Sequence, residues 1–239
     1  MSELYTSENL LDRLSDPRAL EAQDEREKAR ERALVARRLG LAGGDAISVG
    51  CGWHPGRHLL PAPAWRLVAV DMEPDRARVA VERGEADEGF PGRAGELSDV
   101  PADSFDVVLY RYVLHHVAYH QPLEPVFAEA ARLLRPGGAV VAIEPNLWHP
   151  IGAALAAANR LGLGVRVHGT PDDIPLSPRR LMGQVREAGL APELHSVSYS
   201  WRRLPARGQR ILAALDGHGS RRGLRALGHT VLLIARAGG

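Results

Sequence analysis

Four short apolar runs, separated by longer and more polar stretches, constrain the fold of this 239-residue chain more than any other feature. Each run spans six residues, a usual length for a buried strand and too short for an independent helix. The stretches between the runs are long enough to hold helices. Strands that alternate with helices form βαβ units, which build a parallel sheet with helices on both faces. The four runs are 45–50 (DAISVG), 66–71 (RLVAVD), 105–110 (FDVVLY) and 139–144 (AVVAIE).

Weaker signals complete the predicted order of elements. Proline at a first helical position supports helices that start at Pro74 and Pro178, because its fixed φ suits a helix start. The remaining predicted strands lie near 93–96, 193–200 and 230–236. The predicted helices lie over 7–40, between the first strand and about Leu60, and over 74–83, 121–134 and 177–188.

Residues 1–40 are predicted to form a helical cap or lid. The part from Glu21 to Glu31 is almost wholly polar, so it is solvated, mobile, or covers a site only when a ligand is bound. If the region acts as a lid, Tyr5 would reach that site.

Residues 41–239 are predicted to form the core domain, with two unusual segments. An insertion over 147–176 contains an apolar stretch from Ile151 to Leu163, which could form a substrate lid or the face of a homodimer. A second segment, over 201–226, is rich in arginine. It is interpreted as a solvated amphipathic helix, with phosphate binding as the alternative.

The composition excludes several classes of protein. No apolar run reaches the ~18 residues that a membrane span needs, so neither a span nor a membrane partner is expected. The N-terminus lacks the basic and apolar regions of a secretion signal, and the single cysteine, Cys51, excludes a disulfide framework. Both features predict a cytoplasmic protein. The net charge of +1 is not that of a polycation, so nucleic acid is not the expected partner.

The residues after each strand are the candidates for a binding site, because ligands of an open parallel sheet bind beyond the carboxyl ends of its strands. Gly50, Cys51 and Gly52 follow the first strand, and glycines there let the backbone pass close to a ligand. Asp71 closes the second strand roughly 20 residues later, where an acid can accept hydrogen bonds from ribose hydroxyls. Met72 follows and could pack on an adenine ring. Together these positions indicate a nucleotide-containing cofactor.

These positions belong to a longer set of motifs, which read ISVGCG, VAVDMEPDR, GELSDVPADSFDVVLYRYVLHHV and EAARLLRPGGAVVAIEPN in chain order. Over Asp45 to Glu144 the chain resembles the class I S-adenosylmethionine-dependent methyltransferases, in particular their small-molecule branch. The resemblance implies a Rossmann-like α/β fold, with a seven-stranded, mostly parallel sheet, helices on both faces and an antiparallel last strand. It also implies S-adenosyl-L-methionine as cofactor and S-adenosyl-L-homocysteine as product.

The resemblance further implies which residues would hold the cofactor. Its methionine part would lie over Gly50, Cys51 and Gly52, its ribose against Asp71, its adenine beside Met72, Glu96 and Leu97, and its amino group on the backbone at Tyr110 and Arg111.

The first motif departs from the family pattern. Ser48 stands where the family has an acid, and Trp53-His54-Pro55 delay the next glycine. The spacing of Cys51, His54 and His58 is also compatible with zinc, but no fourth ligand is evident nearby, so no metal is predicted.

The adjacent histidines His115 and His116 have two interpretations. In the first, one of them packs beneath the cofactor or caps a short helix. In the second, one of them is a general base facing the acceptor, because imidazole titrates near neutral pH. His116 is the preferred base.

The predicted function is methyl transfer from S-adenosylmethionine to an O or N atom of a small organic acceptor, as in specialised metabolism. The departure at Ser48 leaves open a non-methylating enzyme or a cofactor-free binding subunit on the same fold. Seven arginines against one acid between Trp201 and Arg225 leave open an RNA methyltransferase. No cysteine follows the strand predicted at 105–110, which argues against methylation of cytosine at C5.

Overall fold

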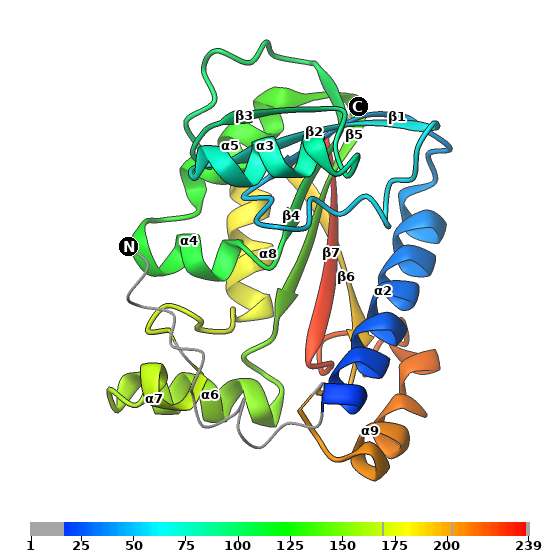
Figure 1. Cartoon of the computed structure of the whole chain (residues 1–239), viewed down its shortest axis with the longest axis vertical. Helices are drawn as coiled ribbons and strands as arrows, with labels where there is room; N and C mark the ends of the chain where they lie inside the picture. Colours follow the sequence, from blue (N-terminus) through cyan, green and yellow to red (C-terminus); the bar gives the residue numbers. More distant parts are fainter. Residues whose placement is uncertain (1–16, 169, 202, 238–239) are drawn as a thin grey trace.

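A seven-stranded sheet forms the centre of the computed structural model, which describes residues 17–168, 170–201 and 203–237 (Figure 1). Its strands lie in the order β3-β2-β1-β4-β5-β7-β6. Strands β1 to β5 pair in parallel, and β7 is antiparallel to both of its neighbours, so the predicted sheet is confirmed. The strands are β1 (Gly44–Val49), β2 (Trp65–Asp71), β3 (Glu88–Pro91), β4 (Phe105–Arg111), β5 (Leu134–Pro145), β6 (Leu190–Ser198) and β7 (Thr230–Ala237).

Helices connect most of the strands. Four of them, α3, α5, α6 and α8, have proline at the first or second helical position, where its fixed φ favours a helix start. The helices are α2 (Pro17–Leu39), α3 (Pro74–Glu82), α4 (Leu114–His120), α5 (Glu124–Leu133), α6 (Pro150–Arg160), α7 (Gly164–His168), α8 (Pro178–Glu187) and α9 (Ala206–Ala213), with a 3-10 helix η2 (Asp216–His218). None in the described ranges has the length and apolar composition needed to cross a bilayer.

Each face of the sheet packs against its own helices. Successive side chains of a strand point to opposite faces, so Ile47 and Val108 join the core under α5 and α8. Their neighbours Ala46 and Val107 join the core under α2. Figure 1 shows α8 (yellow) and α2 (blue) on either side of the strands. The predicted arrangement of helices on both faces is therefore confirmed.

Two predicted elements are wrong. The chain from Gly50 to Leu60 makes turns and no helix. The third strand lies at Glu88–Pro91 instead of 93–96, where Arg93 and Glu96 form only an isolated bridge. The sequence of β3, EGFP, contains glycine and proline and no apolar alternation, so it does not look like a strand. Gly89 is needed there because a Cβ would lie 2.8 Å from the carbonyl oxygen of Ala77.

The polar stretch of α2 has a solvated side, which includes Glu21 and Glu25, and a buried side. Gln23, Glu27 and Glu31 are all buried. Gln23 donates to the Ser198 hydroxyl at 3.3 Å, and Glu27 accepts from the Thr230 hydroxyl. The helix therefore docks partly through buried hydrogen bonds, which hydrophobic periodicity does not reveal. The rest of the predicted cap, residues 1–16 with Tyr5, lies outside the described residues, as does Arg202 of the arginine-rich segment.

Candidate functional site

The glycine loop after β1 has a backbone that side chains would hinder. Gly50 and Gly52 have φ values of +67° and +54°, in the left-handed region. The N–H of Cys51 donates to the carbonyl of Val70 at 3.0 Å, which holds the loop against the end of β2. The missing Cβ of Gly50 allows Val113, just before α4, to approach the loop. The loop thus contacts both the β2 end and the start of the histidine segment.

This geometry predicts different costs for two alanine substitutions. A Cβ at position 50 would lie 2.2 Å from Cγ2 of Val113, whereas nothing lies within 4 Å of one at position 52. Both variants incur about 1 kcal/mol for the left-handed φ. We expect Gly50→Ala to lower the free energy of unfolding by about 2 kcal/mol or more in urea titrations, and Gly52→Ala by about 1 kcal/mol. Equal losses would contradict the close approach of Val113.

Asp71 closes β2 and is bonded to the glycine loop. Its Oδ2 accepts the N–H of Gly52 at 2.8 Å, and its Oδ1 accepts the N–H of Glu73 at 3.0 Å. Arg76 lies 3.9 Å from Oδ1. A carboxylate has about four acceptor positions, so two remain after these backbone bonds. Asp71 can therefore orient the loop and still accept hydrogen bonds from two hydroxyls.

Two side chains beside Asp71 complete this part of the site. Met72 is 56% exposed and offers its thioether to a planar ring. The guanidinium of Arg76 lies 5.8 Å from the ring centroid of Trp53, within cation–π range. Its Nε is buried and has no hydrogen-bond partner among the described residues. Arg76 was not singled out from the sequence, because nothing distinguishes it from other surface arginines of a helix.

Four other predicted cofactor residues lie farther from the loop or turn their side chains away from it. Leu97 is buried in the core, and its N–H donates to Glu129 at 3.1 Å. The Glu96 side chain is exposed, 3.8 Å from Arg93. Tyr110 packs edge-on against Phe127, where burial raises its pKa. Arg111 points to the other face, toward α2. For Tyr110 and Arg111, only the backbone is left for a cofactor.

Glu31 of α2 collects the polar side chains on that second face. Its fully buried carboxylate accepts from Arg111 at 2.9 Å, from the Tyr112 hydroxyl at 3.1 Å, and lies 2.9 Å from Nε2 of His58. Burial opposes its charge, but the hydrogen bond from His58 and the charge of Arg111 prevail and lower the pKa of Glu31. Helix α2 is thereby tied to the loop after β1 and to the end of β4.

The possible zinc ligands have separate partners. His58 contacts Glu31, and His54 lies 3.7 Å from Glu85. Burial, followed by the charge of Asp71, raises the pKa of the Cys51 thiol to about 12, which disfavours the thiolate that zinc requires. Within residues 17–168, 170–201 and 203–237, no group of three or more His, Cys, Asp or Glu side chains is arranged to hold a metal.

His115 lies in a buried acid–base network. Its Nδ1 is 2.6 Å from Oε2 of Glu144, and its Nε2 is 3.3 Å from Asp173. The other oxygen of Glu144 accepts the N–H groups of Val113 and Leu114, at 3.0 and 2.8 Å. Burial lowers the pKa of His115, but the charges of Glu144 and Asp173 outweigh burial and raise it. Glu144 therefore fixes the start of α4 and holds His115, which also contacts the insertion.

His116 is more accessible than His115, and its pKa shifts in the opposite direction. Its ring centroid is 4.1 Å from that of His115, and its Nδ1 lies 3.1 Å from Oδ2 of Asp172. Burial and the positive charge of His115 lower the pKa of His116, so the ring is mainly neutral at pH 7. A neutral, partly exposed imidazole can accept a proton, whereas a charged one cannot. The sequence did not reveal Asp172 and Asp173, which lie in the insertion far along the chain.

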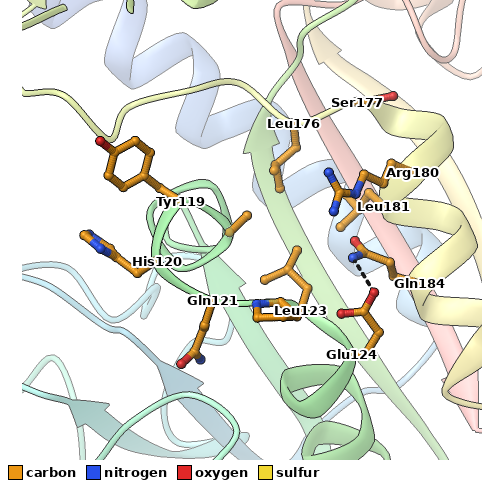
Figure 2. Close-up of a pocket in the computed structure, with 12 residues that line it drawn as sticks. Tyr119, His120, Gln121, Leu123, Glu124, Leu176, Ser177, Arg180, Leu181 and Gln184 are labelled. Carbon is orange, nitrogen blue, oxygen red and sulfur yellow. Dashed lines mark hydrogen bonds between the residues drawn. The ribbon is translucent and has the colours of Figure 1, made fainter.

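A groove of about 580 Å³ lies between the end of α4 and α8 (Figure 2). Figure 2 shows one wall formed by α4 and the turn after it, and the other by α8 with Arg180, Leu181 and Gln184. Gln184 donates to Glu124 at 3.0 Å. His120 in the first wall lies 3.5 Å from Asp172, the carboxylate that also contacts His116. The groove and His116 are thus linked through one side chain.

Comparison with known proteins agrees with this arrangement. Residues 47–142 match the protein-family model described as a methyltransferase domain. An uncharacterized methyltransferase of Schizosaccharomyces pombe is 30% identical over 111 residues, which are 45% of this chain and 43% of that protein. A ubiquinone biosynthesis O-methyltransferase of Xanthomonas oryzae pv. oryzae is 33% identical over 108 residues, 44% of each chain. The chain thus spans less than half the length of these relatives.

Solved structures share the fold over more of the chain. One is a crystal structure from Thermotoga maritima, described as an S-adenosylmethionine-dependent methyltransferase and possible histamine N-methyltransferase. It aligns with 87% of this chain and 88% of its own, at a TM-score of 0.61 and 17% identity. Three features support the same conclusion. They are the strand order, the bond between the glycine loop and Asp71 of β2, and the match of residues 47–142 to the methyltransferase domain. Residues 47–142 therefore form a methyltransferase domain, and the chain has the fold of S-adenosylmethionine-dependent methyltransferases.

Proposed function

We propose that this protein transfers a methyl group from S-adenosylmethionine to an O or N atom of a small organic molecule, leaving S-adenosylhomocysteine. The observation that carries the proposal is Asp71, whose carboxylate orients the glycine loop and keeps two acceptor positions for ribose hydroxyls. The bound cofactor supplies an activated methyl group. The protein then has to hold the two reactants in line, which can lower the barrier by about 7–11 kcal/mol.

The residues around Asp71 fit such a cofactor. Gly50 and Gly52 give it close access to the backbone, and Met72 offers a surface for adenine. The buried Nε of Arg76, without a partner among the described residues, is a further donor for a bound polar group. Ser48 supplies no carboxylate to the loop. The ammonium of the methionine part would therefore rely on backbone carbonyls after β4, near Tyr110 and Arg111.

His116 is proposed as the base that takes the proton from the acceptor. His115 is proposed as a positioning residue, because Glu144 and Asp173 hold both of its ring nitrogens. The groove between α4 and α8 is within the size range of small-molecule sites. The names of the relatives, which mention a quinone pathway and histamine, support a small-molecule acceptor.

Ser48 supports a second candidate, a binding subunit that does not use the cofactor. The residue is buried next to the last position of β1, paired with Ala69 and Leu109, and brings no charge to the loop. A test for methyl transfer separates the two candidates. Metabolite extract incubated with the protein and S-adenosylmethionine carrying a labelled methyl group should yield a labelled small molecule only in the first case.

With the labelled acceptor identified, His116→Ala is expected to lower kcat by about 10²–10⁴-fold, the usual contribution of a general base. Because the pKa of His116 is lowered, kcat of the wild type should stay high as the pH falls to 6.5 and drop only below it. His120→Ala is the comparison, since it removes the other histidine that contacts Asp172; because His120 lines the groove, this variant should raise KM and leave kcat nearly unchanged. Full turnover by His116→Ala would show that His116 is not the base.

A further inference from the structure

The α6–α7 hairpin exposes large apolar side chains that the fold leaves uncovered. Leu161 is 74% exposed at the tip, and Leu163, Val165 and Trp148 are also exposed. The hairpin cannot simply fold these side chains away, because it is anchored next to its tip. Asn159 donates to the carbonyl of Asp173 at 3.1 Å.

The charges on this hairpin have a single sign. Between Leu147 and Thr170 the sequence contains no acid, and Arg160 and Arg166 are both exposed beside the apolar tip. An apolar surface flanked only by arginine is typical of segments that lie in the interface of an anionic membrane.

Helix α9 repeats the same combination. Ile211 is 71% exposed, and Arg207 and Arg210 are exposed on the same short helix. The only acid between Trp201 and Arg225 is Asp216, which is buried and lies 3.5 Å from Arg30. Because Asp216 is buried and paired with Arg30, its charge does not neutralise the exposed arginines of α9. The arginine-rich segment is therefore apolar as well as basic at its surface.

The two elements lie at the same end of the molecule. Helix α6 follows the carboxyl end of β5, and α9 follows the carboxyl end of β6, which runs in the same direction. Figure 1 shows α6, α7 and α9 together at the lower end of the long axis. We propose that this end, here called the basal face and defined by Trp148, Arg160–Arg166 and Arg207–Leu215, binds the surface of an anionic phospholipid bilayer.

The chemistry favours a bilayer over the two other occupants. The residues that define the basal face include no exposed acid, so a symmetric dimer that placed this face against itself would bring its arginines together. Nucleic acid would account for the arginines but leave Leu161 and Ile211 without a role. A bilayer with anionic headgroups uses both, since the arginines meet the headgroups and the apolar side chains enter the acyl boundary.

The basal face lies at the edge of the sheet that also carries the candidate site. The proposal concerns a surface and does not depend on methyl transfer. It departs from the expectation of no membrane partner, which rested on the lack of a spanning segment. Interfacial binding needs no such segment.

The test is co-sedimentation of the full chain with vesicles, either of phosphatidylcholine alone or of equal parts phosphatidylcholine and phosphatidylglycerol. We expect binding to the mixed vesicles that weakens with salt, and little binding to the neutral ones. The variant Leu161→Asn/Ile211→Asn should bind at least about tenfold more weakly. The variant Arg160→Gln/Arg207→Gln should lose about fivefold per arginine.

The matched control is Val81→Asn/Arg78→Gln on α3, an exposed apolar and basic pair outside the basal face, which should bind as the wild type does. Thermal unfolding of every variant checks that the fold is retained. Failure of the wild type to bind mixed vesicles would overturn the proposal. Binding of the Leu161→Asn/Ile211→Asn variant to mixed vesicles as tightly as the wild type would also overturn it. Two further results would overturn it in favour of another occupant: RNA binding that is lost in the Arg160→Gln/Arg207→Gln variant alone, or a concentration-dependent dimer that the same substitutions dissociate.

Discussion

Replacing Asp71 by alanine is expected to lower the affinity for S-adenosylmethionine at least about a hundredfold. Hydrogen bonds to a charged group contribute roughly 1.5–3 kcal/mol each, and two ribose hydroxyls would lose them. About 2.7 kcal/mol already corresponds to a hundredfold change in the dissociation constant. The same substitution frees the N–H of Gly52, which the carboxylate holds at 2.8 Å, so the glycine loop loses its orientation as well. Isothermal calorimetry measures the effect.

The control for this variant is Asp75→Ala. Asp75 is an exposed acid in the first turn of α3 and pairs with Arg78 at 2.9 Å. Its removal changes the net charge equally and should leave cofactor affinity within about twofold. An Asp71→Ala protein that binds as tightly as the wild type would disprove the ribose assignment.

Glu31→Ala is expected to lower the free energy of unfolding by about 3–5 kcal/mol, because removal of one partner leaves a buried charge uncompensated. That charge is the guanidinium of Arg111, whose Nε lies 2.9 Å from the lost carboxylate. The Tyr112 hydroxyl and His58 lose their partner too. Urea unfolding at pH 7 gives the value. The exposed Glu25→Ala of the same helix, which removes only the contact with Lys28, should stay within about 1 kcal/mol of the wild type.

The pH dependence provides a second readout for Glu31. Its pKa in the folded protein lies below the usual 4.5, so its contribution is complete above that pH and is lost as the pH falls through the folded value. The difference between wild type and Glu31→Gln should therefore be constant above pH 4.5 and shrink below it. A difference under 1 kcal/mol at pH 7 would show that the buried network does not hold α2 in place.

The sheet could be predicted because its central strands are continuous apolar runs. β1, β2, β4 and β5 are buried on both faces, which gives each an unmistakable pattern. Strand β3 lies at the edge of the sheet and most of its residues are exposed. Its Gly89 is there because α3 packs too close to the backbone for a side chain. Its position could not be read from hydrophobicity.

Helix α2 shows a different limit of the sequence. Its buried side includes Gln23, Glu27 and Glu31, whose partners lie in strands and loops distant along the chain. A polar residue is identified as buried only once its partner is known. The polarity of the segment therefore suggested solvent exposure, and the structure shows interior hydrogen bonds instead.

The site was predictable where chemistry follows directly from a strand end. Asp71 and the glycines belong to that class, and the structure bonds them together. Asp172 and Asp173 come from the insertion after β5 and meet His115 and His116 only through the tertiary fold. The opposite shifts in the pKa of His115 and His116 depend on those contacts, so they could not be inferred from two adjacent letters.

The central claim is that the loop after β1, with Asp71, binds S-adenosylmethionine, and calorimetric titration of the wild-type chain with S-adenosylmethionine and S-adenosylhomocysteine tests it most directly. We predict binding of both at one site per chain in the micromolar range, with the heat abolished in Asp71→Ala and retained in Asp75→Ala. No heat at millimolar cofactor, from a protein that unfolds cooperatively, would contradict the claim and favour a subunit that uses this fold without the cofactor.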